Sequence, residues 1–250
     1  MKLPASHVML RSGAVRAAIR RDLVATLGPW LLAPRLIVPS RAEPVATGRG
    51  AAFRVELADG TRVVVRLYRR GGLVARFVRE TYAGLWPRPL RELVVTAEAR
   101  RRGVPAAEVL AARVEGGFLY RGALVTAELA TAVTLVDALR GAPDAGVRSA
   151  LAASAGRAIA ALHHAGVFHA DLNLTNIMVR RGPDGGDVTL LDFDRARVRR
   201  GPLASAARRR NLRRLARSVA KLDPAGQVTG PEERRAFGRA YGGGEGGCGS

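Results

Sequence analysis

The feature that most constrains the fold is the segment 169–176, which reads HADLNLTN, together with the Asp192-Phe193-Asp194 triplet that follows it. Two short apolar runs, 177–180 and 188–191, separate these motifs and are joined by a Pro-Asp-Gly-Gly turn. Apolar runs on either side of such a turn predict a β-hairpin. A hairpin returns the chain to its starting point, so the sequence predicts that Asp192 lies beside the loop that precedes the hairpin.

Three polar side chains in these motifs form the set that phosphoryl transfer requires. Asp171 is the candidate for the group that orients or deprotonates the attacking hydroxyl. Asn176 and Asp192 are candidate magnesium ligands, because hard oxygen atoms suit an ion that bridges nucleotide phosphates. The spacing H-x-D-x-x-x-x-N is that of a kinase catalytic loop, in which His169 is expected to support the backbone. The sequence therefore predicts a phosphotransferase.

Hydrophobic patterning predicts a strand-rich first half and a helical second half. The predicted strands cover residues 51–57, 61–68, 109–114, 118–128, 177–180 and 188–191. The predicted helices cover residues 11–27, 90–102, 135–139, 149–165 and 203–222. The first of these helices rests on the spacing of apolar residues at 15, 19, 23 and 27. Arginines on its other side suit either packing on the domain or lying on a membrane surface.

This order of elements indicates an α+β, two-lobed protein-kinase-like fold. Residues 41–130 are expected to form an N-lobe with a small antiparallel β-sheet and one helix. Residues 131–241 are expected to form a mostly helical C-lobe that carries the catalytic loop. Residues 1–40 are expected to form a basic N-terminal extension with a helix, and the Gly-rich tail 242–250 is expected to be disordered.

Candidate nucleotide-binding residues lie in the predicted N-lobe. Arg66 ends the run VVVR, where kinases carry the lysine of V-A-I-K, and a cation there would contact the phosphates. Its partner would be Glu92 or Glu98 on the next helix. Glu92 is preferred because it lies nearer the start of that helix. The alternative for each of these residues is a solvated surface side chain.

Two further nucleotide contacts are expected. Gly48 and Gly50 flank Arg49 in a turn that suits phosphates, but the third glycine of G-x-G-x-x-G is missing, and an ordinary hairpin turn fits as well. Glu128 follows an apolar strand at the junction of the lobes. Its backbone would meet the adenine edge there.

The net charge of +20 indicates attraction to anions. Nucleotide, anionic membrane and nucleic acid all qualify, but aromatic residues make up only 5% of the chain, so nucleic acid is not expected. Arginines gather between residues 195 and 217, and as a group they suit an anionic acceptor or an anionic membrane. No apolar run reaches the ~20 residues that span a bilayer. The single cysteine, Cys248, excludes a disulfide framework and fits a reducing cytoplasm.

Taken as a set, several motifs resemble the 3-deoxy-D-manno-octulosonic acid (Kdo) kinases of the lipopolysaccharide kinase family. The set covers roughly residues 45–222 and consists of GRG (48–50), VRLYRRGGL (65–73), REL (91–93), GVP (103–105), ARV (112–114), HADLN (169–173), DFDR (192–195) and the segment 211–218. Each motif alone is unspecific, but their combination is specific.

The resemblance implies a protein-kinase-like fold and an enzyme that uses ATP and magnesium to phosphorylate a hydroxyl of the Kdo sugar on a lipid A precursor. It implies a peripheral protein at the cytoplasmic face of the inner membrane, in contact with anionic lipid. It also implies that Asp171 is the catalytic aspartate, that Asn176 and Asp192 bind the metal, and that Arg66 matches an arginine of the family.

Three alternatives remain open at this stage. The first is another lipopolysaccharide-core or small-molecule sugar kinase of the same fold, since acceptor specificity resides in loops. The second is an atypical protein serine/threonine kinase, although no A-P-E motif follows Asp192. The third is a non-catalytic nucleotide-binding scaffold on a membrane surface, although such a scaffold has no need of all three polar residues of the predicted site.

Overall fold

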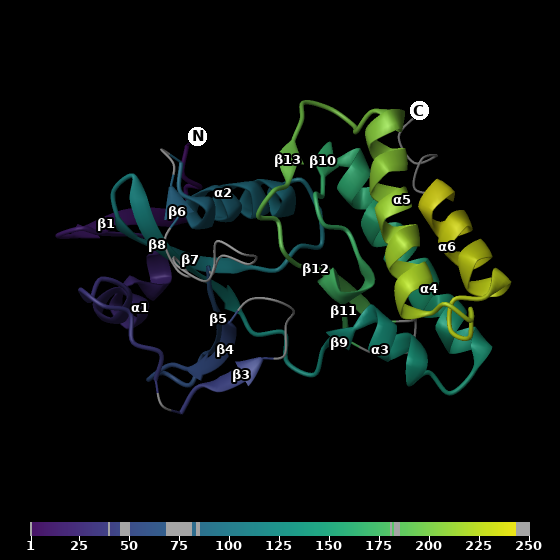
Figure 1. The fold of residues 1–250 in the computed structure, drawn as a ribbon, viewed down its shortest axis with the longest axis horizontal. Helices are drawn as coiled ribbons and strands as arrows, with labels where there is room; N and C mark the ends of the chain where they lie inside the picture. The colour runs from purple at the N-terminus through teal and green to yellow at the C-terminus, as the bar shows by residue number, and fades with distance from the viewer. Residues whose placement is uncertain are drawn as a thin grey trace. The chain divides into compact units, whose positions relative to one another are not determined.

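The computed structural model describes residues 2–39, 41–45, 51–68, 82–83, 86–180, 182 and 186–243 (Figure 1). The chain forms two compact units. Unit 1 consists of Met1–Ala97 and Glu108–Glu128, and unit 2 of Glu98–Ala107 and Leu129–Ser250. The chain passes from one unit to the other within helix α2 (Arg88–Arg101), between Ala107 and Glu108, and again just after Glu128.

Unit 1 is built on an eight-stranded sheet with the order β1-β2-β7-β8-β5-β4-β3, and β6 pairs with β8. All of its strand pairs are antiparallel. The strands are β1 (His7–Ser12), β2 (Val15–Arg20), β3 (Glu43–Val45), β4 (Ala51–Glu56), β5 (Arg62–Leu67), β6 (Tyr82–Ala83), β7 (Val109–Gly116) and β8 (Leu119–Ala127). The predicted strands of this half and the hairpin at Gly60 are therefore confirmed.

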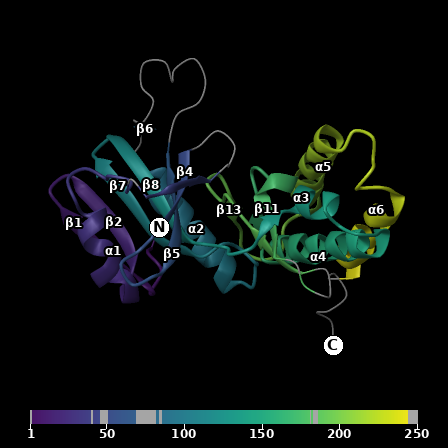
Figure 2. The ribbon, with the colours of Figure 1, turned by 90° about the horizontal axis from the view of Figure 1, so that it is seen from below.

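Both faces of this sheet are covered (Figure 2). On one face, Val63 and Val65 of β5 pack with Leu27 and Leu31 of helix α1 (Val24–Leu31). On the other face, Leu93 of α2 packs with residues of β7 and β8. Val63 and Val65 are fully buried at a spacing of two, which is the alternation expected of a strand with one face in a core. Unit 1 thus has a second helix, α1, beyond the one predicted.

The helix predicted over residues 11–27 is wrong for most of its length. Residues 7–20 form the β1–β2 hairpin around Gly13, whose φ of 55° suits glycine, and the short 3-10 helix Arg21–Leu23 precedes α1. The apolar spacing misled because Ala17 and Ala18, both fully buried, make β2 apolar on both faces. Pairing of β2 with β7 provides hydrogen bonds for the backbone of β2. This tertiary contact outweighs the helical spacing of the apolar residues.

Unit 2 is mostly helical, as predicted. Its helices are α3 (Leu135–Arg140), α4 (Ala145–His164), α5 (Ser205–Leu222) and α6 (Pro231–Gly243). Its short strands are β9 (Val133–Thr134), β10 (Val167–Phe168), β11 (Ile177–Arg180), β12 (Asp187–Leu190) and β13 (Arg197–Val198), with the 3-10 turn η3 (Leu174–Asn176) before β11. The hairpin predicted to follow the catalytic loop is confirmed as β11–β12.

Helix α6 was not predicted, although its start carries recognisable signals. Pro231 occupies the first helical position, and Glu232 and Glu233 lie in the first turn. Proline loses no hydrogen bond there, and acidic side chains favour the positive end of the helix dipole. No helix in the described part of the chain is both long enough and apolar enough to cross a bilayer. The predicted tail 242–250 lies outside the described residues apart from Gly242 and Gly243.

Helices α4 and α6 approach closely at Gly156. A Cβ atom added there would lie 2.6 Å from the carbonyl oxygen of Phe237 and 3.2 Å from the backbone nitrogen of Tyr241. Both neighbours are backbone atoms of α6, so they cannot move aside as a flexible side chain would. The contact between these helices therefore requires a residue without a side chain at this position.

We expect Gly156→Ala to lower the free energy of unfolding by about 1–2 kcal/mol, because the clash with α6 outweighs the gain in helix propensity. The matched control is Gly238→Ala on α6, where nothing lies within 4 Å of the added Cβ. That variant should be more stable by about 0.5–1 kcal/mol. Urea titration followed by circular dichroism measures both, and equal stabilisation of the two variants would contradict the close approach.

Candidate active site

The predicted catalytic loop begins where α4 ends. Gly166 follows the helix with a φ of 71°, and a Cβ atom there would collide with the carbonyl oxygen of Gly201. Glycine at this position lets the chain turn directly from the last helical residue into β10. β10 pairs with β13, which follows Asp192 in the sequence. This pairing brings the two ends of the motif region together.

His169 connects the two polar motifs through both of its ring nitrogens. The backbone N–H of Asp171 lies 3.2 Å from Nδ1, and Nε2 lies 2.8 Å from the carbonyl oxygen of Leu191. Since the Asp171 N–H can only donate, Nδ1 accepts and Nε2 carries the proton. The ring also packs edge-on against Phe193, at 5.0 Å between centroids. His169 therefore supports the backbone on both sides, as the sequence indicated.

Burial keeps His169 neutral. Its ring is completely buried, and this desolvation lowers the pKa of His169 below its usual range. A neutral imidazole has one donor and one acceptor, which matches the two contacts just described. The geometry of the loop thus depends on the uncharged ring.

Helix α5 holds the loop from its other side. The side-chain amide of Asn211 is fully buried, donates to the carbonyl oxygen of His169 at 2.6 Å and accepts from its backbone N–H at 3.2 Å. The hydroxyl of Ser218 accepts from the N–H of Leu174 at 3.1 Å. These roles of Asn211 and Ser218 were not inferred from the sequence. The sequence contains one signal for them. Asn211 and Ser218 are polar, uncharged residues in an arginine-rich helix, and their spacing of seven residues places them on the same face.

His163 extends the same network towards α6. Its Nδ1 lies 2.8 Å from the hydroxyl of Tyr241, and its Nε2 lies 3.3 Å from Oδ1 of Asn211. Burial lowers the pKa of His163 to about 4, so the ring is neutral near pH 7. The support of the loop therefore reaches from α5 through α4 to α6.

Asp171 has a fixed backbone and an exposed carboxylate. Its carbonyl oxygen accepts from the side-chain amides of Asn173 and Asn176, at 3.2 and 2.8 Å. Its side chain is 61% exposed, and Oδ1 lies 3.8 Å from Nη1 of Arg214. A carboxylate held in this way is available to accept a hydrogen bond from an incoming hydroxyl.

Asn176 and Asp192 lie next to each other because their flanking backbones are bonded. The N–H of Leu191 donates to the carbonyl oxygen of Asn176 at 2.9 Å. Asp192 has a φ of 62°, a left-handed conformation that few side chains tolerate and aspartate tolerates better than most. An unusual backbone angle at this position is typical of a functional site. The sequence-predicted trio Asp171, Asn176 and Asp192 is thus brought together within unit 2.

The donor atoms of this pair fit magnesium. The Nδ2 of Asn176 donates to Asp171, and within the described residues its Oδ1 has no hydrogen-bond donor, so that oxygen can bind a cation. No cluster of three or more His, Cys, Asp or Glu side chains that would hold an ion occurs in the described ranges. An ion here would therefore depend also on phosphate oxygens and water, which is how magnesium is usually bound.

In unit 1, Arg66 pairs with Glu92. Nη2 of Arg66 contacts Oε2 of Glu92, and the hydroxyl of Tyr68 donates to the same oxygen. The Glu92 side chain is only 3% exposed, whereas that of Arg66 is 28% exposed. Glu98, the other candidate, pairs instead with Arg101 and Arg102. Hydrogen bonds, chiefly from Arg101, lower the pKa of Glu98 to about 2.

Glu128 is the last residue of unit 1, and its polar groups are partly committed. Its N–H donates to the carbonyl oxygen of Arg62 at 3.2 Å, and its carboxylate contacts Nε of Arg54. Oε2 of Glu128 is buried without a partner among the described residues. The backbone N–H of Glu128 is thus already bonded, whereas no described residue donates to its carbonyl oxygen, which can accept a hydrogen bond from a ligand. Gly48 and Gly50 lie outside the described residues.

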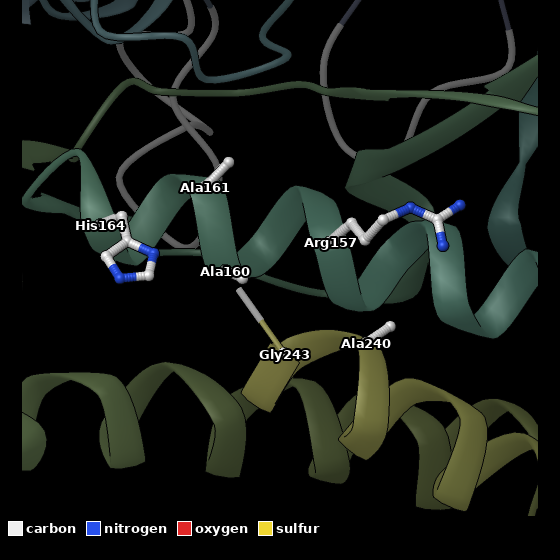
Figure 3. Close-up of a pocket in the computed structure, with 6 residues that line it drawn as sticks. All are labelled: Arg157, Ala160, Ala161, His164, Ala240 and Gly243. Atoms are coloured by element: carbon white, nitrogen blue, oxygen red, sulfur yellow. The ribbon is translucent and has the colours of Figure 1, made fainter. Parts of the chain in front are cut away.

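A separate hollow lies between α4 and the end of α6 (Figure 3). It is lined by Arg157, Ala160, Ala161, His164, Ala240 and Gly243. None of the predicted site residues that the structure describes lines it, and its lining includes the guanidinium of Arg157, which also donates to Ser154. This hollow has no part in the chemistry of the catalytic loop.

Comparison with known proteins shows the family of the chain. The family model described as "Lipopolysaccharide kinase (Kdo/WaaP) family" matches residues 41–241. A 3-deoxy-D-manno-octulosonic acid kinase of Xanthomonas campestris pv. campestris (strain B100) is 41% identical over 73% of this chain and 71% of its own. The corresponding kinase of Xylella fastidiosa (strain M12) is 37% identical over 75% of each chain.

Among solved structures, WaaP in complex with acyl carrier protein is similar in fold. It has a TM-score of 0.56 and 20% identity, over 82% of this chain and 78% of that one. The predicted α+β, two-lobed protein-kinase-like fold and the predicted kinase activity are confirmed by these likenesses. The chain belongs to the lipopolysaccharide kinase (Kdo/WaaP) family.

Proposed function

We propose that this protein transfers the γ-phosphoryl group of ATP to a hydroxyl of the Kdo sugar on a lipid A precursor. The observation that carries the proposal is the exposed carboxylate of Asp171. The loop that presents it is held at His169 by Asn211, at Asp171 by the His169 ring, and at Leu174 by Ser218. The relatives named as Kdo kinases support this choice of acceptor. Neither the fold nor the loop favours a protein acceptor or a non-catalytic scaffold.

The proposed reaction is a single displacement at phosphorus. The hydroxyl oxygen of the sugar forms a bond to the γ-phosphorus, and the bond from that phosphorus to the bridging oxygen of ADP breaks. Asp171 accepts the hydrogen bond of the attacking hydroxyl and takes its proton as the new bond forms. Asn176 and Asp192 would hold magnesium, which supplies positive charge to the phosphate oxygens when bound.

Each unit, taken by itself, carries candidate nucleotide-binding residues. In unit 2, a small hollow is lined by Leu129, Ala130, Ala132, Met178, Arg180, Asp187 and Thr189. Met178 belongs to β11, which follows Asn176, and Thr189 belongs to β12, which precedes Asp192. The apolar part of its lining, which Leu129, Ala130, Ala132 and Met178 supply, suits a nucleobase. In unit 1, Arg66 is expected to contact phosphate from its pair with Glu92, and the carbonyl of Glu128 and the 48–50 turn remain expected contacts.

A peripheral site at the cytoplasmic face of the inner membrane is supported by the surface of α5. Arg209, Arg213, Arg217 and Lys221 are exposed at intervals of four residues, so they follow one side of the helix. The opposite side carries Asn211, Leu215 and Ser218, two of which contact the catalytic loop. Basic side chains near an anionic bilayer each contribute about 1 kcal/mol of attraction.

The variant Asp171→Asn should lower kcat by about 10²–10⁴-fold, because the amide cannot accept the proton of the attacking hydroxyl. The assay is transfer of radiolabelled phosphate from ATP to Kdo-lipid A precursor, with heptosyl-lipid and a protein as competing acceptors. Asp22→Asn is the matched control, since that carboxylate is as exposed as that of Asp171, pairs with Arg20 and belongs to none of the candidate sites. Undiminished turnover in Asp171→Asn, or transfer only to protein, would refute the proposed function.

The variant Glu92→Gln should raise the KM for ATP by about 10-fold, because Arg66 loses the charge-assisted bond that orients it. Its stability should fall by about 1–3 kcal/mol, since the lost contact is buried. Glu98→Gln is the control on the same helix, and its partly exposed pairs with arginine should have little effect on either quantity. Initial-rate kinetics over a range of ATP concentrations, with thermal unfolding in parallel, test the difference between the two variants.

The triple variant Arg209→Gln, Arg213→Gln and Arg217→Gln should bind anionic vesicles about 100-fold more weakly, since each lost charge costs about 1 kcal/mol. The control removes the same charge elsewhere, by Arg35→Gln, Arg235→Gln and Arg239→Gln, at exposed positions away from α5. Co-sedimentation with vesicles that contain phosphatidylglycerol measures both. If the two triple variants lose equal affinity, α5 is not the membrane-facing surface.

A further inference from the structure

Arg214 stands out on the face of α5 that is turned towards the catalytic loop. Its neighbours on that face, Asn211 and Ser218, both form hydrogen bonds with the loop backbone. Arg214 forms no hydrogen bond with any described residue, and its Nε is buried without a partner in that part of the chain. Its side chain is 33% exposed, so part of it remains accessible to a ligand although Nε is buried. A buried donor without an acceptor is unfavourable, and a ligand that supplies one relieves that cost.

The guanidinium of Arg214 lies beside the reacting position. Its Nη1 is 3.8 Å from Oδ1 of Asp171, which is too far for a hydrogen bond but close enough for electrostatic attraction. The two side chains therefore attract each other without occupying each other's hydrogen-bonding groups. One molecule of the size of a sugar ring can place a hydroxyl on Asp171 and an anionic group on Arg214 at the same time.

We propose that Arg214 binds an oxyanion of the acceptor and so places the acceptor hydroxyl against Asp171. The inference rests on the proposed function, in which the acceptor is a sugar acid. The planar fork of arginine donates two parallel hydrogen bonds to a carboxylate or a phosphate, which fixes orientation as well as position. The carboxylate of the sugar and a phosphate of the lipid can both accept such a pair of hydrogen bonds.

The exposed arginines of α5 do not meet these conditions. Arg209, Arg213 and Arg217 are exposed, where salt and water weaken single ion pairs. Arg214 is less exposed than these arginines and its Nε is buried, so water weakens a hydrogen bond from Nε less. A neutral sugar would leave the buried Nε of Arg214 unpaired, and this penalty would select against neutral acceptors.

The test combines an enzyme change with an acceptor change. Wild type and Arg214→Gln are each assayed with Kdo-lipid A precursor, with the same lipid carrying Kdo carboxamide, and with the lipid lacking its phosphates. Arg214→Gln should lower kcat/KM about 10–100-fold for the unmodified acceptor and have little effect for the carboxamide. Its KM for ATP should be unchanged. Arg214→Lys keeps the positive charge but not the planar fork. Its kcat/KM for the unmodified acceptor should lie between those of wild type and Arg214→Gln.

Arg239→Gln on α6 is the control for loss of one exposed positive charge, and thermal unfolding of each variant checks the fold. If the loss is confined instead to acceptors that retain phosphate, the oxyanion that Arg214 binds is the phosphate. Equal losses for all three acceptors would overturn the proposal, because Arg214 would then act only by positioning Asp171.

The proposed function and the proposed role of Arg214 can be refuted independently of each other. If wild type phosphorylates no Kdo acceptor, that function is refuted, and binding of free Kdo by wild type and Arg214→Gln, measured by ligand-observed NMR, decides the role of Arg214. Equal binding by the two proteins would overturn the assignment. Binding lost in Arg214→Gln and partly kept in Arg214→Lys would support it.

Discussion

The site depends on one buried, neutral imidazole. His169 accepts a hydrogen bond from the N–H of Asp171 and donates one to the carbonyl of Leu191, so a single ring sets the distance between the two polar motifs. Its complete burial lowers its pKa, which keeps it uncharged and preserves this pattern of one donor and one acceptor. A charged ring would have two donors, and the N–H of Asp171 would lose its acceptor.

Different elements hold different parts of the loop around that ring. Helix α4 ends at the loop, and α5 covers it with Asn211 and Ser218. Backbone bonds from Leu191 to Asn176 then bring the hairpin back to the loop. Every polar group of the loop backbone named here is bound by a rigid neighbour, whereas the carboxylate of Asp171 is left exposed. Such an arrangement lets a site receive substrate without reorganising its own backbone.

The two units contribute different groups of residues. Unit 1 covers both faces of its sheet and buries Glu92, whose charge is balanced by Arg66 and whose second contact is Tyr68. Unit 2 supplies the loop, the hairpin and the basic helix. The family membership, the exposed Asp171 and the uncommitted donors of Arg214 converge on an anionic acceptor handled by unit 2. The roles of the individual site residues remain predictions.

Local signals were sufficient for much of the chain. The β4–β5 and β7–β8 hairpins and α2 to α5 follow from alternation, turn residues and helical periodicity, because each is specified by residues that are neighbours in sequence. The same reasoning failed for residues 11–23, where the intrinsic preference of Ala17 and Ala18 for a helix disagrees with the strand that they form. Long-range pairing of β2 with β7 decided between them. Helix α6 was missed although Pro231 and two glutamates mark its start.

The sequence by itself determined the chemical identity of the site, because the order and spacing of Asp171, Asn176 and Asp192 are properties of one short segment. Only the tertiary structure decided which residues hold that segment in place. Asn211 and Ser218 are more than thirty-five residues from the groups they bind, and Arg214 is more than forty from Asp171. No sequence pattern relates positions so far apart, since their contact arises from the packing of α5 on the loop.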